Sequence, residues 1–301
     1  MRKRLVLFLV SCFALQQANA QYQNLLNPQN TQQIQKFKEQ KVVVQTAFLD
    51  VNGSQSPYGM FKFDTEGRIL SNITPKNHQH FTYDASGRII TFIDSAHDGR
   101  RFWKTEYAFA YDADGRPATF KLGKQTASFS YNAATRELAE VNGNAKTIYR
   151  YNEENKLVEE VTTGGDEPKT HKYIYNKYGD LANEIIARQD ANGTDTTRIS
   201  YSFDSKGKLM RKMVTQTRRM NESEDPTEPQ TVVKTTKTYN YVYDVRTGLI
   251  TTENMVSSNP KESCKTEWTY DNFGLPVKET KLDGTGKPIQ TMVYKYSYTR
   301  K

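Results

Sequence analysis

Hydrophobic and polar residues follow a short pattern that recurs about ten times along the chain. A typical copy has an aromatic residue, a variable residue, a second aromatic, Asp or Asn, two variable residues, usually Gly, often Arg or Lys, and an aliphatic residue. The clearest copies begin at Phe61, Phe81, Phe109, Tyr149 and Tyr201. Residues two apart in a strand lie on the same face, so the pattern predicts a strand with both aromatics on one side of a sheet.

The residue between the two aromatics lies on the other side of the predicted sheet. It is polar or small in most copies, which predicts that this side faces solvent. The positions are Lys62, Thr82, Ala110, Ser130, Arg150, Ile174, Ser202, Val242, Thr269 and Lys295.

The Asp or Asn that follows the aromatics predicts a tight hairpin turn. Its side chain accepts hydrogen bonds from the backbone ahead, and Gly three positions later adopts the left-handed conformation of a bulged hairpin. The matching glycines are Gly67, Gly87, Gly115, Gly179, Gly207 and Gly274, and Asn155 replaces Gly in one copy. Three further copies depart from the pattern. Thr135 occupies the glycine position in one, Gly248 follows one place late in another, and Ser297 replaces the Asp or Asn in the copy from Tyr294.

These features predict an all-β repeat protein with about ten β-hairpin units over residues 46–301. About twenty strands spaced ~4.8 Å apart would span roughly 95 Å if flat, and so wide a sheet curls or closes. We expect a long antiparallel meander that curls into an open or partly closed sheet, with the aromatics inside. Aliphatic residues at the start of each return strand should fill the space between the rings; they are Ile69, Ile89, Leu138, Leu157, Leu181, Leu209 and Leu249.

Residues 1–20 have the features of a signal peptide. A basic start at 2–4 precedes an apolar core at 5–15 and a small-x-small cleavage motif at 18–20. We therefore expect a secreted, periplasmic or cell-envelope protein without a transmembrane span after cleavage. A lipoprotein signal at Cys12 is the weaker alternative, because few residues precede that cysteine. After cleavage Cys264 stands alone, so no intrachain disulfide is expected.

Two segments differ from the repeats. Residues 21–45 are rich in Gln and Asn, and Thr31 is a suitable N-cap for a short helix with Ile34 and Phe37 on one face. We expect this helix to cap a sheet edge. Residues 220–230 are acidic and contain two prolines, so we expect a mobile hairpin tip there.

The repeated string resembles the YD repeat of bacterial RHS and teneurin-like proteins. The resemblance is clearest at 81–89, 109–116 and 201–209, and it covers most of residues 58–301. It implies a coiled β-sheet shell, which in that family often surrounds a toxic C-terminal domain and works at cell surfaces or in competition between cells. The last repeat, at 294–298, is followed by no toxin domain and no Pro/Asp/Gly-containing boundary motif. We therefore expect a YD-repeat protein without the toxin domain.

Residues suited to catalysis or metal binding are few, and we expect neither a catalytic site, a metal nor a cofactor. The repeated aspartates already have turns to cap. The acidic stretches 112–115 and 190–195 lack the full oxygen ligand set of a calcium loop. His78 and His80 are separated by one residue, so both rings could lie on one face of a strand. Too few other histidines are present to complete a zinc site.

Charge is the remaining indication of a partner. The formal net charge is +8; removing the three basic residues at 2–4 leaves 8 − 3 = +5. Basic and aromatic residues occur together at the candidate ligand-binding residues Arg100, Arg101, Phe102, Trp103 and Lys104. A second basic cluster without aromatics contains Lys206, Lys208, Arg211, Lys212, Arg218 and Arg219. Such surfaces suit an anionic polymer, although a solvated sheet face has the same composition.

Three functions therefore stay open. The first is a non-catalytic exported scaffold or binding module for an anionic glycan or cell-surface polymer; nucleic acid is not expected because the chain is exported. The second is an RHS-like shell that holds or delivers a partner protein. The third is a glycan-active enzyme that uses two carboxylates across the curl.

Overall fold

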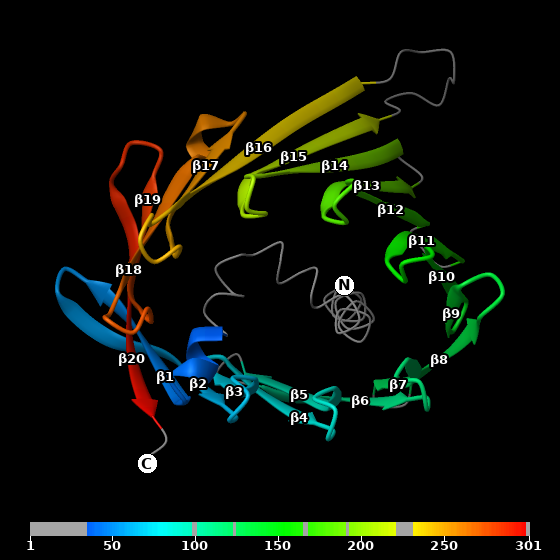
Figure 1. The fold of residues 1–301 in the computed structure, drawn as a ribbon, viewed down its shortest axis with the longest axis horizontal. Helices are drawn as coiled ribbons and strands as arrows, with labels where there is room; N and C mark the ends of the chain where they lie inside the picture. Colours follow the sequence, from blue (N-terminus) through cyan, green and yellow to red (C-terminus); the bar gives the residue numbers. More distant parts are fainter. Residues whose placement is uncertain are drawn as a thin grey trace. The chain divides into compact units, whose positions relative to one another are not determined.

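The computed structural model describes residues 35–97, 101–122, 125–164, 168–190, 193–220 and 231–298. The expected signal peptide, Thr31, Ile34 and residues 221–230 lie outside this part of the chain. The described residues form twenty strands, a helical stretch at 35–39 and one 3-10 turn, η1 (Pro260–Glu262) (Figure 1). The prediction of an all-β antiparallel meander is confirmed.

The described chain divides into two compact units. Unit 1 is a meander in which β18, β19, β20, β1 and then β2 to β7 pair in this order, always antiparallel. The last strand therefore pairs with the first, with Val42 opposite Tyr298. Its strands are β1 (Val42–Val51), β2 (Ser54–Phe63), β3 (Ile69–Ile73), β4 (Asn77–Tyr83), β5 (Ile89–His97), β6 (Phe102–Tyr111), β7 (Pro117–Leu122), β18 (Cys264–Tyr270), β19 (Pro276–Asp283) and β20 (Pro288–Tyr298).

Unit 2 is a second antiparallel meander, and its strands pair in chain order wherever the registers are described. Three strands have residues in both units: β8 (Gln125–Asn132), β16 (Thr231–Tyr243) and β17 (Ile250–Ser257). The strands of unit 2 are β8 (Gln125–Asn132), β9 (Glu137–Asn142), β10 (Ala145–Tyr151), β11 (Leu157–Thr163), β12 (Lys169–Tyr175), β13 (Leu181–Asp190), β14 (Gly193–Phe203), β15 (Leu209–Met220) and β16 (Thr231–Tyr243).

The two faces of each meander differ as the pattern predicts. We call the side that carries the repeat aromatics the aromatic face and the other side the opposite face. On the aromatic face of unit 1, Phe92 stacks between Phe81 and Tyr107, with ring centroids 4.8 and 5.1 Å away. Of the ten residues between the paired aromatics, eight are exposed and only Thr82 and Arg150 are half-buried. The predicted solvent-facing side is confirmed.

The aliphatic residues that begin the return strands are buried on the aromatic face. Six of the seven predicted residues are buried, and Ile69 is half-buried. Helical residues 35–39 also pack on this face: the Phe37 ring lies 4.6 Å from that of Phe63, in a cluster with Val42 and Leu275. The contact is made on the face of the sheet, since the neighbouring strand β1 is paired on both sides.

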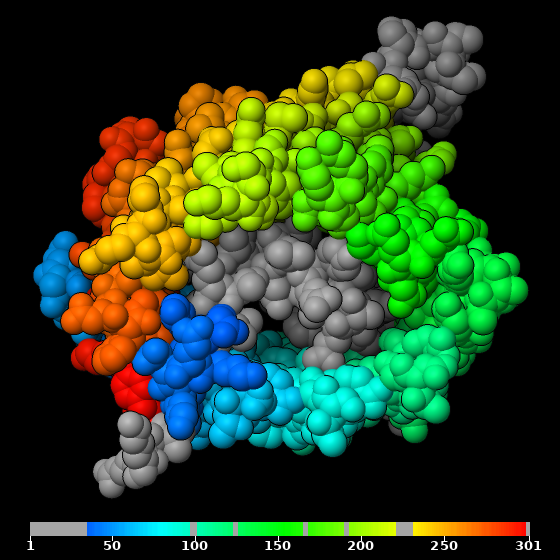
Figure 2. Space-filling view, in the orientation of Figure 1, coloured from blue at the N-terminus to red at the C-terminus, as the bar shows by residue number. Residues whose placement is uncertain are grey.

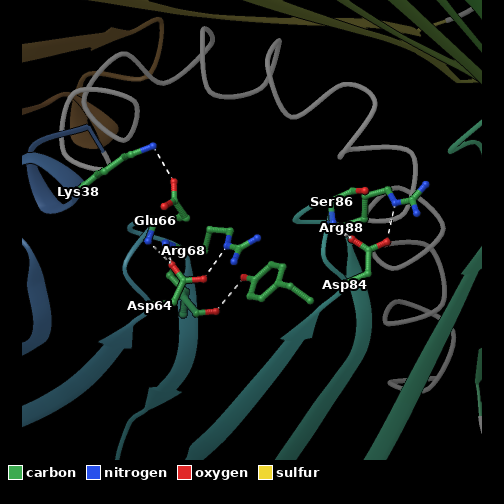
Figure 3. Close-up of polar contacts among 9 residues, drawn as sticks. Lys38, Asp64, Glu66, Arg68, Asp84, Ser86 and Arg88 are labelled. Carbon is green, nitrogen blue, oxygen red and sulfur yellow. Dashed lines mark hydrogen bonds and ion pairs between the residues drawn. The ribbon is translucent and has the colours of Figure 1, made fainter.

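The hairpin turns use the hydrogen bonds that the sequence predicts (Figure 3). In the first turn, the N–H of Gly67 donates to the Asp64 carbonyl, and Oδ1 of Asp64 accepts from the N–H groups of Glu66 and Arg68. Oδ2 of Asp64 accepts from Nε of Arg68 at 2.6 Å. Gly67 has φ +76° and Asn155 has φ +59°, so Asn replaces Gly in the left-handed conformation as predicted.

Two turns differ from the sequence pattern. In the copy from Phe129 the left-handed residue is Arg136, with φ +52°, and not Thr135. Asn132 pairs with Glu137 there, so the loop is one residue longer than in the regular turns. A further turn of the regular type runs from Asp283 to Gly286, which has φ +88°. The aromatic pattern missed it because no aromatic pair precedes Asp283.

In five copies of the repeat the second aromatic is a tyrosine that links its hairpin to the preceding one. Its hydroxyl donates to the carbonyl of the residue that begins the preceding return strand, at 2.5–2.8 Å. These pairs are Tyr83 with Ile69, Tyr111 with Ile89, Tyr175 with Leu157, Tyr270 with Ile250 and Tyr296 with Pro276. The basic residue that closes one turn also lies over the next tyrosine ring, as Arg68 does over Tyr83 at 4.7 Å. The Tyr-Asp and Gly-Arg pairs of the repeat thus join successive units.

Replacing Tyr111 with phenylalanine should lower the free energy of unfolding by about 1–2 kcal/mol, because a partly buried hydrogen bond is lost. Burial raises the pKa of Tyr111 to about 12, so the hydroxyl stays a donor at neutral pH. Urea unfolding followed by circular dichroism measures the change. Tyr178→Phe is the control, since Tyr178 is 78% exposed; equal effects of the two variants would contradict the link between hairpins.

Candidate functional site

The basic and aromatic residues predicted to bind a ligand lie at the start of β6 in unit 1. Arg100 lies outside the described residues, and Arg101, Phe102, Trp103 and Lys104 are all exposed. Phe102 is 70% exposed and Trp103 is 46% exposed. The side chains of β4–β6 form part of the molecular surface, where they are seen as cyan atoms (Figure 2).

Strand alternation distributes these residues over both faces of β6. Trp103 is opposite Ala96 and shares the aromatic face with Tyr107, four residues further along the strand. Phe102 and Lys104 lie on the opposite face. Each face of β6 therefore presents one exposed aromatic ring, and the structure does not gather the predicted residues into a single patch.

A small hollow lies where the β3–β4 turn, the end of β5 and the start of β6 meet. Its volume is about 150 Å³, below the range of about 300–1,000 Å³ typical of pockets for drug-sized ligands. Two cationic or ionisable side chains, several hydroxyl and amide groups and one aromatic ring border it. The lining residues are Thr74, Pro75, Lys76, Asn77, His78, Ser95, Ala96 and Phe102. The hollow can accept one small polar or anionic group.

The histidines of β4 lie beside this hollow. His78 and His80 are exposed and share the opposite face, two residues apart on the strand. His78 is opposite Ser95, which is opposite Lys104. Within the described ranges, no group of three metal-ligating side chains occurs. The sequence pattern does not predict that Lys76 and Phe102 border the same hollow. The pairing of β4 with β5 and of β5 with β6 brings them together, and that register cannot be read from the local pattern.

A second group of ionisable residues lies on the aromatic face of unit 2. Glu140, Glu160 and Glu184 are 4–8% exposed, although buried carboxylates are rare unless they are paired. Tyr149 donates to Glu140 at 2.8 Å, and Lys169 donates to Glu160 at 2.9 Å. Each acid thus has a described partner.

The partners of Glu184 come from two neighbouring strands. Its Oε2 lies 2.7 Å from Nε2 of His171, and its Oε1 accepts from the Tyr201 hydroxyl at 2.5 Å. The hydroxyl of Tyr173 lies 2.9 Å from Nδ1 of His171. His171 therefore belongs to a buried hydrogen-bond network across β12, β13 and β14.

The environment of the glutamates shifts their pKa values in different directions. Burial raises the pKa of Glu140, and the hydrogen bond from Tyr149 only partly opposes it. Burial also acts to raise the pKa of Glu184, but hydrogen bonds from His171 and Tyr201 lower it overall. Because each glutamate already has a hydrogen-bond partner from another strand, we interpret the group as links between strands and not as a catalytic acid and base pair.

The repeats and their turns agree with a known family. The family model described as Teneurin YD-shell matches residues 50–295. The chain belongs to the Teneurin YD-shell family. The resemblance to YD and RHS repeats is thereby confirmed, and this YD-shell chain is a structural shell or scaffold.

Several solved structures resemble this YD-shell chain at low identity. A porin-like protein from Bacteroides vulgatus has 14% identity and a TM-score of 0.35, over 69% of this chain and 97% of its own. A porin-like protein from Bacteroides uniformis has 11% identity and a TM-score of 0.36, over 86% and 97%. TcdB2-TccC3 has 11% identity and a TM-score of 0.31, over 85% of this chain but 19% of its own. No curated protein sequence matches the YD-shell chain.

No helix among the described residues is long and apolar enough to cross a membrane.

Proposed function

We propose that this YD-shell protein is an exported, non-catalytic scaffold that binds an anionic glycan or cell-surface polymer. The site is the opposite face at the start of β6, at Phe102 and Lys104, together with the hollow that Phe102 borders. The amino-terminal signal pattern supports export, since residues 1–20 have the charge, apolar length and cleavage motif of a signal peptide.

The observation that carries this proposal is the exposure of Phe102 beside cationic side chains. A ring that is 70% exposed borders a hollow together with Lys76 and His78. Aromatic rings pack against the apolar faces of sugars, while cationic groups pair with carboxylate or sulfate. Lys104 adds a further cation on the same face.

The test is a binding screen of the purified protein against envelope polysaccharides and a glycan array, at low and high salt. We expect salt-sensitive binding, because exposed ion pairs weaken as salt screens them. The variant Phe102→Ala/Lys104→Ala should lower the affinity about tenfold. The variant Trp103→Ala removes the exposed ring on the aromatic face of β6, and it should lower the affinity less.

The control is the variant Lys177→Ala/Tyr178→Ala. Lys177 lies over the Tyr178 ring at 4.9 Å, and this cation and ring lie in an exposed turn of unit 2. The control variant therefore removes one cation and one exposed ring, as the β6 variant does, but in a different part of the chain. Equal loss of binding in the control and at β6 would show general stickiness of basic and aromatic residues, and unchanged affinity in the β6 variants would remove this site from the proposal.

Two other functions give different results in the same experiments. A shell that holds a partner protein would bind no glycan and would recover one protein in stoichiometric amount in a pull-down. A glycan-active enzyme would release shorter products from one of the glycans that it binds. The network around Glu140 and Glu184 does not favour this third function, since those carboxylates are already paired.

A further inference from the structure

The opposite face of β14, β15 and β16 in unit 2 is a regular grid of side chains. Ser202 occupies the position between the two repeat aromatics, which places it on this face, and the strand register places fourteen more residues beside it. The rows across the three strands are Ser202–Arg211–Asn240, Ser200–Met213–Thr238, Arg198–Thr215–Thr236, Thr196–Thr217–Lys234 and Thr194–Arg219–Val232. The strand and residue spacings make the grid roughly 10 Å wide and 27 Å long.

All the charged residues of this grid carry the same sign of charge. Its charged members, Arg198, Arg211, Arg219 and Lys234, are all basic and all exposed. None of the fifteen residues is Asp or Glu, and eight are Ser or Thr. The four cations have no ion pair with any residue in the described ranges. The two other basic residues of β15 that lie nearby, Lys212 and Arg218, are on the aromatic face, where Arg218 pairs with Asp195 at 2.9 Å.

The same face of unit 2 is different on the preceding strands. Arg150 of β10 contacts Glu137 at 2.8 Å and also pairs with Glu159 of β11. Lys172 of β12 lies 3.6 Å from Glu159. Arg150 and Lys172 are therefore paired with neighbouring acids, as on an ordinary solvated sheet face. On this one face of unit 2, Arg150 and Lys172 are paired with acids, whereas the four cations of β14–β16 are not. The composition of the face as a whole therefore does not explain the unpaired cations.

We infer that the opposite face of β14–β16 is a binding surface for a linear anionic polysaccharide. The four cations would pair with its carboxylate or sulfate groups, and the serine and threonine hydroxyls would donate and accept hydrogen bonds with its sugar hydroxyls. The length of the grid follows the strand direction, which suits an extended chain.

The side chains of the grid favour this partner over two other polyanions. None of the fifteen residues is aromatic, and non-specific binding of single-stranded nucleic acid relies on stacking of bases on aromatic rings. Val232, at one corner, is the only exposed apolar residue of the grid, whereas attachment to a lipid surface needs buried apolar area. This inference extends the proposed polymer-binding function to a second surface, separate in sequence from the start of β6.

The test measures binding of the full protein to three probes that share one backbone: dextran sulfate, carboxymethyl-dextran and uncharged dextran. We expect binding to at least one charged dextran and none to dextran. Which charged dextran binds distinguishes sulfate from carboxylate recognition. The variant Arg198→Gln/Lys234→Gln should weaken binding about tenfold, since two exposed charge contacts together contribute about that factor. It should also flatten the dependence of affinity on salt.

The control is Arg150→Gln/Lys172→Gln, which removes the same net charge from the paired part of the same face. We expect less than a twofold change in its affinity. Equal weakening by the two variants, or no binding to either charged dextran, would overturn the inference. Tighter binding to anionic phospholipid vesicles or to single-stranded DNA than to the charged dextrans would overturn the choice of polysaccharide.

The same assay separates this surface from the one at β6. If Phe102→Ala/Lys104→Ala weakens binding about tenfold and Arg198→Gln/Lys234→Gln leaves it unchanged, the proposed function stands and the grid is only a solvated face. The reverse result would place the polymer on β14–β16 and remove the β6 site. Circular dichroism of each variant shows whether its fold is retained.

Discussion

Replacing Lys169 with methionine is expected to lower the free energy of unfolding by about 3–5 kcal/mol, because it leaves a charged partner buried and unpaired. The Lys169 and Glu160 side chains are 6% and 10% exposed, and Nζ lies 2.9 Å from Oε1. Methionine retains most of the volume of lysine, so the cost comes from the lost charge. Urea unfolding, followed by the far-ultraviolet circular dichroism of the sheet, measures the change.

Two further variants test this explanation. Glu160→Leu/Lys169→Met removes both charges and should recover much of the lost stability, as buried ion pairs commonly do when both partners become apolar. Lys172→Met is the surface control, since its side chain is 57% exposed and lies 3.6 Å from Glu159. It should change the stability by less than about 1 kcal/mol. Similar effects of Lys169→Met and Lys172→Met would contradict a buried pair.

Replacing Gly193 with alanine is expected to lower the free energy of unfolding by about 2–6 kcal/mol. Gly193 has φ +150°, and an added Cβ would lie 1.9 Å from the carbonyl oxygen of Arg219 on the paired strand. Backbone strain of about 1–3 kcal/mol adds to overpacking of about 1–3 kcal/mol. The atom in the way belongs to the backbone, so β14 and β15 would have to move apart at this end.

Gly207→Ala provides the matched control for Gly193→Ala. Gly207 also has a positive φ, +77°, but nothing lies within 4 Å of an added Cβ. It should therefore cost only the left-handed strain of about 1–2 kcal/mol. Thermal or urea unfolding of both variants compares them directly. If both cost the same, the close approach to Arg219 has no energetic effect.

Much of the fold follows from the repeat itself. The aromatic pair, the Asp or Asn and the left-handed Gly67 or Asn155 each have a local cause, namely strand alternation or turn geometry. Each of these effects involves residues of one copy of the repeat, so a single copy is enough to predict its own strand and turn. The pairing of β20 with β1 joins residues 42–49 with residues 292–298. Because these residues are far apart in the sequence, no local pattern predicts the pairing.

The buried glutamates show why part of the site could not be predicted. Simple alternation from Leu157 would place Glu159 on the same face as the leucine and Glu160 on the other. Each regular turn, however, is followed by a bulge: Tyr151 is opposite Leu157, and Arg150 is opposite Glu159, so Val158 has no partner. One extra residue reverses the order of faces. Glu160 therefore joins the aromatic face, as Glu184 does three residues after Leu181.

The division of the chain into two units also determines which unit can fold first. Unit 2 takes most of its residues from one continuous stretch, 127–241, so its hairpins can form as that stretch emerges. Unit 1 needs both β1 and β20, which are separated by more than two hundred residues. Until β20 arrives, the outer edge of β1 presents unpaired backbone groups, and such an edge invites pairing with another chain. Long-range closure is slow in general, and a newly made chain is therefore most prone to misassembly during the interval before its final strand is added.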